Sequence, residues 1–237
     1  MGGRSIGAKK KVRHHVNPLK DVHMQPIKLA DDWPDEYYAD PTLPIHVDIG
    51  CARGVFCLDL ASLNTGVNVA GLEIRSVLAE AAQEDASHLR LGNVAFFGTN
   101  ANANLERVLQ GATSSRASGS LLRSASIQFP DPWFKARHQK RRVVQPDLVR
   151  VLADHLPKDG WLWMQSDVLD VAQDMRETVR TTEPDRLQDA VEDFDDWTVE
   201  KPSLLANVAT ERERSSAELN RPVYRCLFRA TGGVSSS

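Results

Sequence analysis

Residues 129–142 (FPDPWFKARHQKRR) contain side chains that could do chemistry on a nucleobase. Two prolines flank a single acid, Asp131, and restrict the backbone around it, so its carboxylate is held in a defined position. Trp133 and Phe134 offer aromatic faces on which a base can stack. Such a segment, placed after a predicted strand, is typical of the working loops of α/β enzymes. Five cations that would neutralise phosphates follow with no acid among them: Lys135, Arg137, Lys140, Arg141 and Arg142.

A solvated charge run on a surface loop is the alternative interpretation of this segment. An acid locked between prolines and two large aromatics are costly to place on a loop without a purpose, so we favour function. For Lys140, Arg141 and Arg142 we predict contacts with the phosphates of a nucleic acid. Ion pairs with the many acids of residues 167–200, which would hold the fold instead, are the structural alternative.

A second motif, Asp48–Gly54 (DIGCARG), closes the first predicted strand and opens the first predicted helix. Its small residues fall at Gly50, Ala52 and Gly54, which does not fit the G-x-G-x-x-G fingerprint of dinucleotide sites. The spacing is closer to the acidic-x-Gly-x-Gly-x-Gly turn of methyltransferases that bind S-adenosylmethionine, although Ala52 replaces the middle glycine. A tight strand–helix turn without a ligand is the alternative.

The next two strand ends carry groups that suit the same cofactor. Glu73 ends the second predicted strand, and a carboxylate there can accept hydrogen bonds from both ribose hydroxyls. Asn100-Ala101 follows the third strand and could bond the adenine edge, although a lone asparagine at this place is more often a helix cap. Three consecutive strand ends with suitable groups favour a cofactor site.

Composition limits the classes of protein that remain. The chain has 237 residues, a net charge of −3, no apolar run long enough to span a bilayer and no metal-ligand spacing. Three cysteines, an odd number, indicate a reducing compartment, which leaves the cytoplasm, a plastid and the nucleus open. Residues 1–20 hold six cations and no acid. These local basic patches on a mildly acidic chain favour a nucleic-acid partner.

The order of apolar segments predicts one α/β domain, a doubly wound, mostly parallel sheet with an antiparallel C-terminal strand. Strands are expected over 45–50, 67–74, 94–97, 121–129, 161–166 and 223–229. Helices are expected over 55–63, 76–91, 101–109, 145–156 and 168–179. We predict a mobile basic arm over 1–20, an irregular covering segment over 21–44, the domain over 45–230, a flexible loop over 111–120 and a disordered tail over 231–237.

The chain resembles the tRNA (guanine-N(7)-)-methyltransferase family from about residue 45 to 229. The motifs that carry the resemblance are DIGC (48–51), GLEIR (71–75), FPDPW (129–133) with Lys135 and Lys140–Arg142, SDV (166–168) and TERE (210–213). The resemblance implies that Asp131 is catalytic. It implies a cofactor site made of Asp48, Gly50, Glu73, Arg75, Asn100, Ala101 and Asp131, and substrate contacts from Lys135, Asp167, Thr210, Glu211, Arg212 and Glu213.

The expected activity is methyl transfer from S-adenosylmethionine to N7 of a guanine in tRNA, with a second protein subunit or a homodimer as a possible assembly and no membrane or metal. Ala52, the serine-rich loop 111–120 and Asn100 depart from the family pattern. Two hypotheses from other classes stay open: a catalytically inactive RNA-binding or scaffold protein on the same fold, and a nicotinamide-dependent dehydrogenase, which the glycine spacing disfavours.

Overall fold

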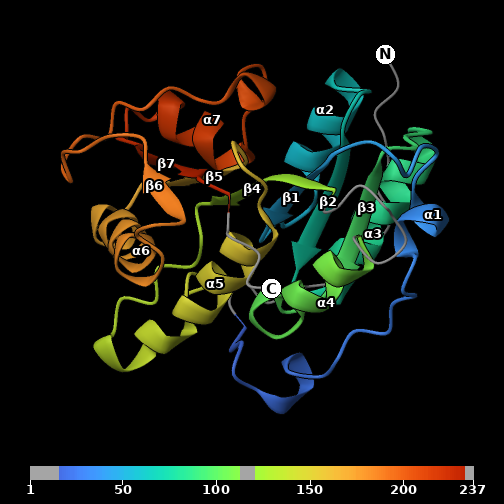
Figure 1. The fold of residues 1–237 in the computed structure, drawn as a ribbon, viewed down its shortest axis with the longest axis horizontal. Helices are drawn as coiled ribbons and strands as arrows, with labels where there is room; N and C mark the ends of the chain where they lie inside the picture. The colour runs from blue at the N-terminus through green and yellow to red at the C-terminus, as the bar shows by residue number, and fades with distance from the viewer. Residues whose placement is uncertain (1–15, 113–120, 233–237) are drawn as a thin grey trace.

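The computed structural model describes residues 16–112 and 121–232. Within these residues, seven strands form one sheet in the order β3-β2-β1-β4-β5-β7-β6 (Figure 1). The strands are β1 (Ile45–Ile49), β2 (Asn68–Glu73), β3 (Val94–Gly98), β4 (Leu122–Gln128), β5 (Trp161–Ser166), β6 (Leu187–Asp189) and β7 (Tyr224–Ala230). β1 to β5 are parallel, whereas β7 runs antiparallel to its neighbours β5 and β6. The predicted fold class is therefore confirmed.

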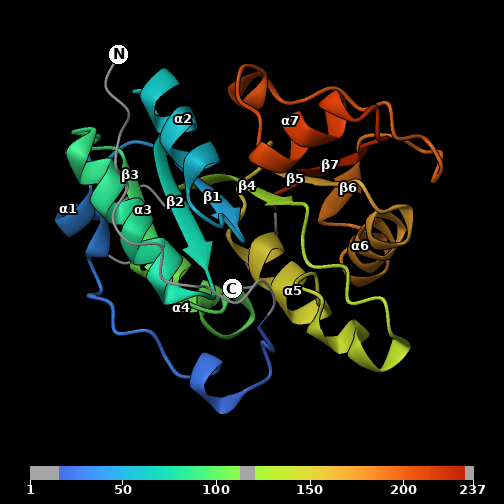
Figure 2. The same ribbon diagram turned by 180° about the vertical axis from the view of Figure 1, so that it is seen from behind.

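Helices cover both faces of the sheet, as Figures 1 and 2 show from opposite sides. α2 (Val55–Leu63) and α3 (Ser76–His88) pack on one face. α4 (Ala101–Gly111), α5 (Pro146–His155) and α6 (Leu169–Thr182) pack on the other. Because both faces are covered, every residue of β1 and β2 is buried. The carboxyl ends of β1 to β5 meet at one edge of the sheet, where open α/β sheets bind their ligands.

Several short elements were not predicted from the sequence. They are η1 (Asp21–His23), α1 (Trp33–Tyr37), η2 (Ala136–Arg141), η3 (Ser203–Leu205), β6 and α7 (Glu211–Glu218). Two helix ends also differ from the prediction by three residues. The helix expected to reach residue 91 ends at His88, because Arg90 takes a left-handed φ of 56°. The helix expected over 168–179 begins at Leu169 and continues to Thr182.

Residues 21–44 are held against α4 and β3 by hydrogen bonds and aromatic packing. The Trp33 ring is 1% exposed, donates its Nε1–H to the Val108 carbonyl (2.9 Å) and packs edge-on against Phe97. The buried Asn104 amide accepts from the Ile27 N–H and donates to the Gln25 carbonyl, both at 2.9 Å. α4 therefore acts as the support that fixes this segment to the domain.

Parts of the predicted organisation lie outside the described residues: 1–15 of the arm, 113–120 of the loop and 233–237 of the tail. The three cysteines are buried and unbridged. Among the residues described, no helix is long and apolar enough to cross a membrane. No group of three or more metal-ligating side chains occurs in that part of the chain either.

Candidate active site

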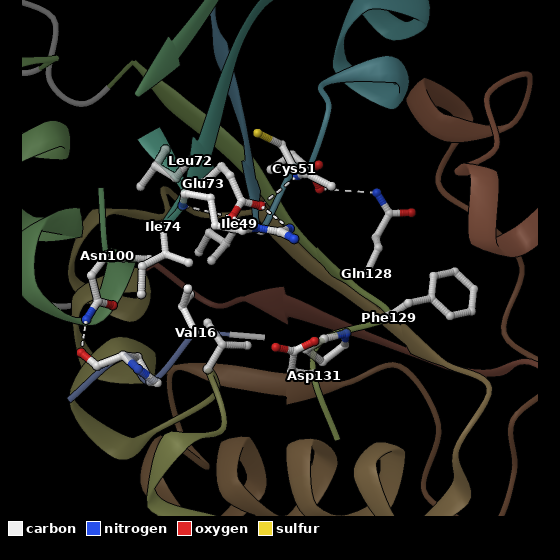
Figure 3. Close-up of a pocket in the computed structure, with 18 of the residues that line it drawn as sticks. Val16, Ile49, Cys51, Leu72, Glu73, Ile74, Asn100, Gln128, Phe129 and Asp131 are labelled. Carbon is white, nitrogen blue, oxygen red and sulfur yellow. Dashed lines mark hydrogen bonds and ion pairs between the residues drawn. The ribbon is translucent and has the colours of Figure 1, made fainter. Parts of the chain in front are cut away.

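A cavity of about 350 Å³ opens at the carboxyl ends of the central strands (Figure 3). The residues that were singled out from the sequence and line this cavity are Asp48, Gly50, Glu73, Arg75, Asn100, Ala101, Asp131, Thr210, Glu211 and Arg212. Lys135, Asp167 and Glu213 lie outside its lining. The fold thus brings the three strand ends, the proline-flanked acid and the start of α7 to one space.

The first turn, Asp48–Gly54, depends on left-handed backbone. Gly50, Ala52 and Gly54 have φ values of 86°, 52° and 73°. A Cβ at Gly54 would lie 2.6 Å from the Phe96 ring, so only glycine fits there. A Cβ at Gly50 would meet no atom within 4 Å, so this side of the turn stays open. Ala52 adopts its left-handed φ despite its Cβ, at a cost of about 1–2 kcal/mol.

Glu73, at the end of β2, is 3% exposed and fully hydrogen-bonded. Its Oε1 accepts from the Arg75 backbone N–H (3.0 Å) and from Arg75 Nε (2.7 Å). Its Oε2 accepts from the Ala52 N–H (3.0 Å) and from Arg75 Nη2 (3.1 Å). A carboxylate offers about four acceptor positions, so Arg75 and the first turn use all of them in this structure.

Asp48 forms the polar floor of the cavity and is 3% exposed. Its Oδ1 accepts from the Ser126 hydroxyl (2.6 Å) and from the Gln128 amide (3.2 Å). Burial raises the pKa of the Asp48 carboxyl, and these hydrogen bonds to the ionised form oppose the rise.

His46 lies behind Asp48 on β1 and is fully buried. Its Nε2 is 3.0 Å from the Ser126 hydroxyl, and its Nδ1 is 2.8 Å from the Ser124 hydroxyl. Because Ser126 donates to Asp48, it must accept from His46, which assigns the neutral tautomer with a proton on Nε2. Burial lowers the pKa of His46 to about 3.

Asn100 caps α4 and also holds the N-terminal segment. Its Oδ1 accepts from the Asn102 N–H (3.1 Å), and its Nδ2 donates to the Pro18 carbonyl (3.1 Å). Val16 and Pro18 line the cavity, and Figure 3 shows Val16 within it. The side chain expected to bond adenine is thus engaged as a cap and as an anchor. Val16 and Pro18 of the predicted arm form part of the cavity wall.

Asp131 faces the cavity from a strained loop (Figure 3). Phe129 and Trp133, on either side of the PDP sequence, have φ values of 49° and 43°. Such values in bulky residues each cost about 1–3 kcal/mol and cluster at functional sites. The Phe129 N–H is fixed by the Gln165 carbonyl at 2.8 Å. The hydrogen bonds to Glu73 are the main cause that raises the pKa of Arg75, and the charge of Asp131 adds to it.

The cations after this loop do not all serve the same role. Arg142 is 4% exposed, with ion pairs to Asp170 (2.5 Å) and Asp174 (3.1 Å) and a bond from Nε to the Pro132 carbonyl (3.0 Å). For Arg142 the structure supports the alternative, ion pairs with the acids of residues 167–200, because its charge anchors the loop to α6. Lys135, Arg137 and Lys140 are exposed.

The two aromatic residues of this segment, Trp133 and Phe134, also lie in different surroundings. Trp133 lines the cavity, with the Arg141 guanidinium 5.0 Å from its ring centroid and His138 edge-on at 5.8 Å. Phe134 is 72% exposed and lies beside the exposed cations in sequence. One ring therefore belongs to the cavity wall and the other to the outer surface.

Thr210–Glu213 forms the start of α7. The Thr210 hydroxyl accepts the Glu213 N–H (3.0 Å), which is one half of a capping box. Arg212 pairs with Asp167 (2.6 Å), so these two expected substrate residues form one unit at the cavity. The Glu213 carboxylate is instead turned inward, where it pairs with Lys201 (2.8 Å) and Arg225 (3.0 Å).

Sequence reasoning missed Gln128, Val16 and Pro18, all of which line the cavity. Gln128 immediately precedes the FPDPW motif, and its position as the last residue of β4 was the signal that could have revealed it. Val16 and Pro18 were grouped with the basic arm. Their apolar character next to a basic run was the available signal.

Comparisons with known proteins agree with this geometry. The model of the family described as "Putative methyltransferase" matches residues 42–226. The chain is 42% identical to a tRNA (guanine-N(7)-)-methyltransferase of Microcystis aeruginosa over 94% of this chain and 99% of that protein. It is 43% identical to the protein of the same name from Synechococcus elongatus, over 93% and 97%.

Solved structures share the fold at low sequence identity. The 16S rRNA methyltransferase KamB aligns with a TM-score of 0.54 at 14% identity, over 88% of this chain and 96% of that one. The aminoglycoside resistance methyltransferase NpmB1 aligns with a TM-score of 0.50 at 16% identity, over 86% and 95%. The strand order and these likenesses define a Rossmann-like sheet, and the matching family model defines a methyltransferase. The chain belongs to the tRNA (guanine-N(7)-)-methyltransferase family.

Proposed function

We propose that this protein uses S-adenosylmethionine to methylate N7 of a guanine in tRNA, with Asp131 as the catalytic residue. The observation that carries the proposal is that Asp131 and Glu73 line one cavity at the carboxyl ends of the strands. The membership of the chain in its family supports both the reaction and the tRNA substrate. Glu73 on the cofactor and Asp131 on the target guanine can then act on two ligands that meet in the same cavity.

The residues present suit the cofactor. The cavity volume of about 350 Å³ lies within the usual range for small-molecule sites. The open side of Gly50 allows close approach to the first turn, and the apolar Ile74 and Val16 line the same cavity. Asp48 offers a buried acceptor for the amino group of the cofactor. Glu73 can accept the ribose hydroxyls once they replace the Arg75 guanidinium, which already bonds it in the same way.

When bound, S-adenosylmethionine supplies a methyl group activated by a sulfonium. Guanine N7 carries an in-plane lone pair, so this chain needs no general base to create the nucleophile. Its residues must align the base and stabilise the positive charge that develops on it. An ionised Asp131 does both, because it can accept hydrogen bonds from the guanine N1–H and N2–H₂ groups. The strained backbone at Phe129 and Trp133 supports a preorganised carboxylate.

The two aromatics have separate roles in this proposal. Trp133 lines the cavity and is held by Arg141, so we assign it to the wall against which the target guanine stacks. Phe134 projects outward near Lys135 and Arg137 and contacts RNA beyond the target base. Arg212, held by Asp167, adds a cation at the cavity mouth. A guanine within folded tRNA must leave its stack before it reaches this site.

The direct test is incubation of the protein with unmodified tRNA and labelled S-adenosylmethionine. Cleavage of the RNA at 7-methylguanosine, after borohydride reduction and aniline treatment, then maps the modified base. We expect label at N7 of one guanine. Saturable cofactor and tRNA binding without transfer would favour the inactive RNA-binding alternative. Label on another base or another atom would contradict the proposed reaction.

A further inference from the structure

A chain of hydrogen bonds crosses the end of the sheet. It joins the cofactor half of the site, around Asp48, to the substrate half, at the start of α7. Gln128 donates through Nε2 to Asp48 Oδ1 (3.2 Å), and its Oε1 accepts from Gln165 Nε2 (2.8 Å). The same Gln165 nitrogen is 3.3 Å from Glu213 Oε2. The chain therefore runs from the floor of the cavity to the start of α7, through two glutamine side chains.

The direction of these bonds is determined by the acids at both ends. Ionised Asp48 and Glu213 can only accept hydrogen bonds, so the bridge must donate at each end. Gln165 uses its amide hydrogens for Gln128 and Glu213, and its Oε1 is 3.4 Å from Arg225 Nε. Gln128 accepts on one side and donates on the other. A glutamate at either position would bring a third carboxylate into a buried network.

The bridge is built on two adjacent strands in the middle of the sheet. Gln128 and Gln165 are register partners in the parallel pair β4 and β5, at the carboxyl ends of both strands. Gln165 is fully buried. Its backbone carbonyl also accepts a hydrogen bond from the N–H of Phe129 (2.8 Å). Phe129 is the first residue of the strained loop around Asp131. Gln165 therefore contacts Gln128, which bonds Asp48, and Phe129, which begins the Asp131 loop. It also contacts Glu213 in α7.

We propose that Gln165, acting through Gln128, is a positioning residue that fixes the start of α7 and the cofactor-site carboxylate in one relative geometry. This inference rests on the proposed function, in which Asp48 faces the cofactor and Thr210–Arg212 face the tRNA. Gln165 is fully buried and does not line the cavity, so its loss leaves each half of the site with its own lining residues. What is lost is the alignment of the two halves, on which the rate of group transfer depends.

Gln165→Met tests the proposal, because methionine keeps the length of the side chain and removes its hydrogen bonds. Gln83→Met is the control, since the half-buried Gln83 amide also accepts one bond, from the Phe96 N–H (3.0 Å), outside the site. At saturating tRNA and cofactor, and below both melting temperatures, we expect kcat of Gln165→Met to fall about tenfold or more. The dissociation constants of S-adenosylhomocysteine and tRNA should change less than about threefold, and Gln83→Met should keep wild-type kcat.

If the wild-type protein is active and Gln165→Met has the same kcat as both the wild type and Gln83→Met, the positioning role is overturned. The proposed function then stays in place. A wild-type protein that methylates no tRNA would overturn both. Weakened binding of either ligand in step with kcat would also contradict the proposal, since it would indicate direct loss of a half-site. If Gln165→Met does not fold, Gln128→Met is measured the same way, with a wild-type kcat as the contradicting result.

Discussion

Glu73 and Asp131 line the same cavity, one at the end of a strand and the other in a strained loop. Glu73 belongs to the cofactor half, which we define as the turns after β1, β2 and β3; it is buried and accepts four hydrogen bonds. Asp131 belongs to the substrate half, defined as residues 129–142 and 210–213, where the backbone is strained at Phe129 and Trp133. The first arrangement is suited to recognise a ligand that replaces existing partners. The second is suited to hold a charge ready for a reaction.

The largest expected effect is that of Asp131→Asn, which tests the substrate half. Removing the charge while keeping the shape should lower kcat about 10²–10³-fold, because electrostatic stabilisation of a developing charge is worth that much. Cofactor affinity and the melting temperature should remain those of the wild type. Asp147→Asn, at an exposed acid on α5, is the control. Turnover close to wild type at saturating tRNA would mean that the charge of Asp131 is not used.

Glu73→Ala tests the cofactor half and should act on binding. The loss of charge-assisted hydrogen bonds is expected to weaken S-adenosylmethionine by about 1–3 kcal/mol, measured by calorimetry. Glu80→Ala, at an exposed acid on α3, provides the control. An unchanged dissociation constant would remove Glu73 from the ribose site and leave it as a partner of Arg75 and the Ala52 N–H.

Acid should lower the free energy of unfolding through His46, which lies behind Asp48 on β1. The folded protein holds His46 neutral with a pKa lowered to about 3, so protons bind more tightly to the unfolded chain below the ordinary pKa of 6.5. The stability is therefore present above pH 6.5 and is lost at about 1.4 kcal/mol per pH unit as the pH falls towards 3. Denaturant titrations should show this slope in the wild type and lose it in His46→Gln.

Arg142→Ala and Lys140→Ala should separate two kinds of cation in the substrate half. Arg142→Ala should lower the free energy of unfolding by about 1–3 kcal/mol, because a buried guanidinium and its bonds are lost. Lys140→Ala should leave stability unchanged and reduce the slope of log K for tRNA against log salt by about one unit. The reverse pattern would mean that Arg142 reaches RNA and Lys140 holds the fold.

The smallest effect is expected from Ala52→Gly. Glycine relieves the left-handed φ of 52° at this position. After the larger entropy of unfolded glycine is subtracted, we expect a gain of about 1 kcal/mol or less, or roughly 2–4 °C in melting temperature. A lower melting temperature would show that the Ala52 methyl group makes packing contacts that outweigh its strain.

Local patterns predicted the parts of the fold that local forces decide. The strand-helix alternation and the turn at Gly50 and Gly54 appear in the sequence because sterics and burial act on neighbouring residues. β6 has only three residues and depends on pairing with β7. Its sequence is therefore too short to show the alternating pattern that predicts a strand. α7 was missed although Thr210 and Glu213 have the spacing of a capping box, since its apolar content is low.

Long-range pairing explains the errors and omissions in the site. The sequence left two roles open for Arg142, and its pairing with Asp170 and Asp174, about thirty residues along the chain, decides between them. Gln128 and Gln165 carry no motif, because an amide becomes informative only when strand register places it beside another. The motif residues of the cofactor turn and the proline-flanked acid were predictable since their chemistry and backbone restraint are both local.

The most direct test of this division of labour is the single-turnover rate of methyl transfer in Glu73→Ala and Asp131→Asn, measured while the cofactor concentration is raised to saturation. We expect Glu73→Ala to recover to within about threefold of the wild-type rate, because its defect is in binding. Asp131→Asn should remain about 10²–10³-fold slow at every concentration. A rate that saturating cofactor restores in Asp131→Asn but not in Glu73→Ala would contradict the account.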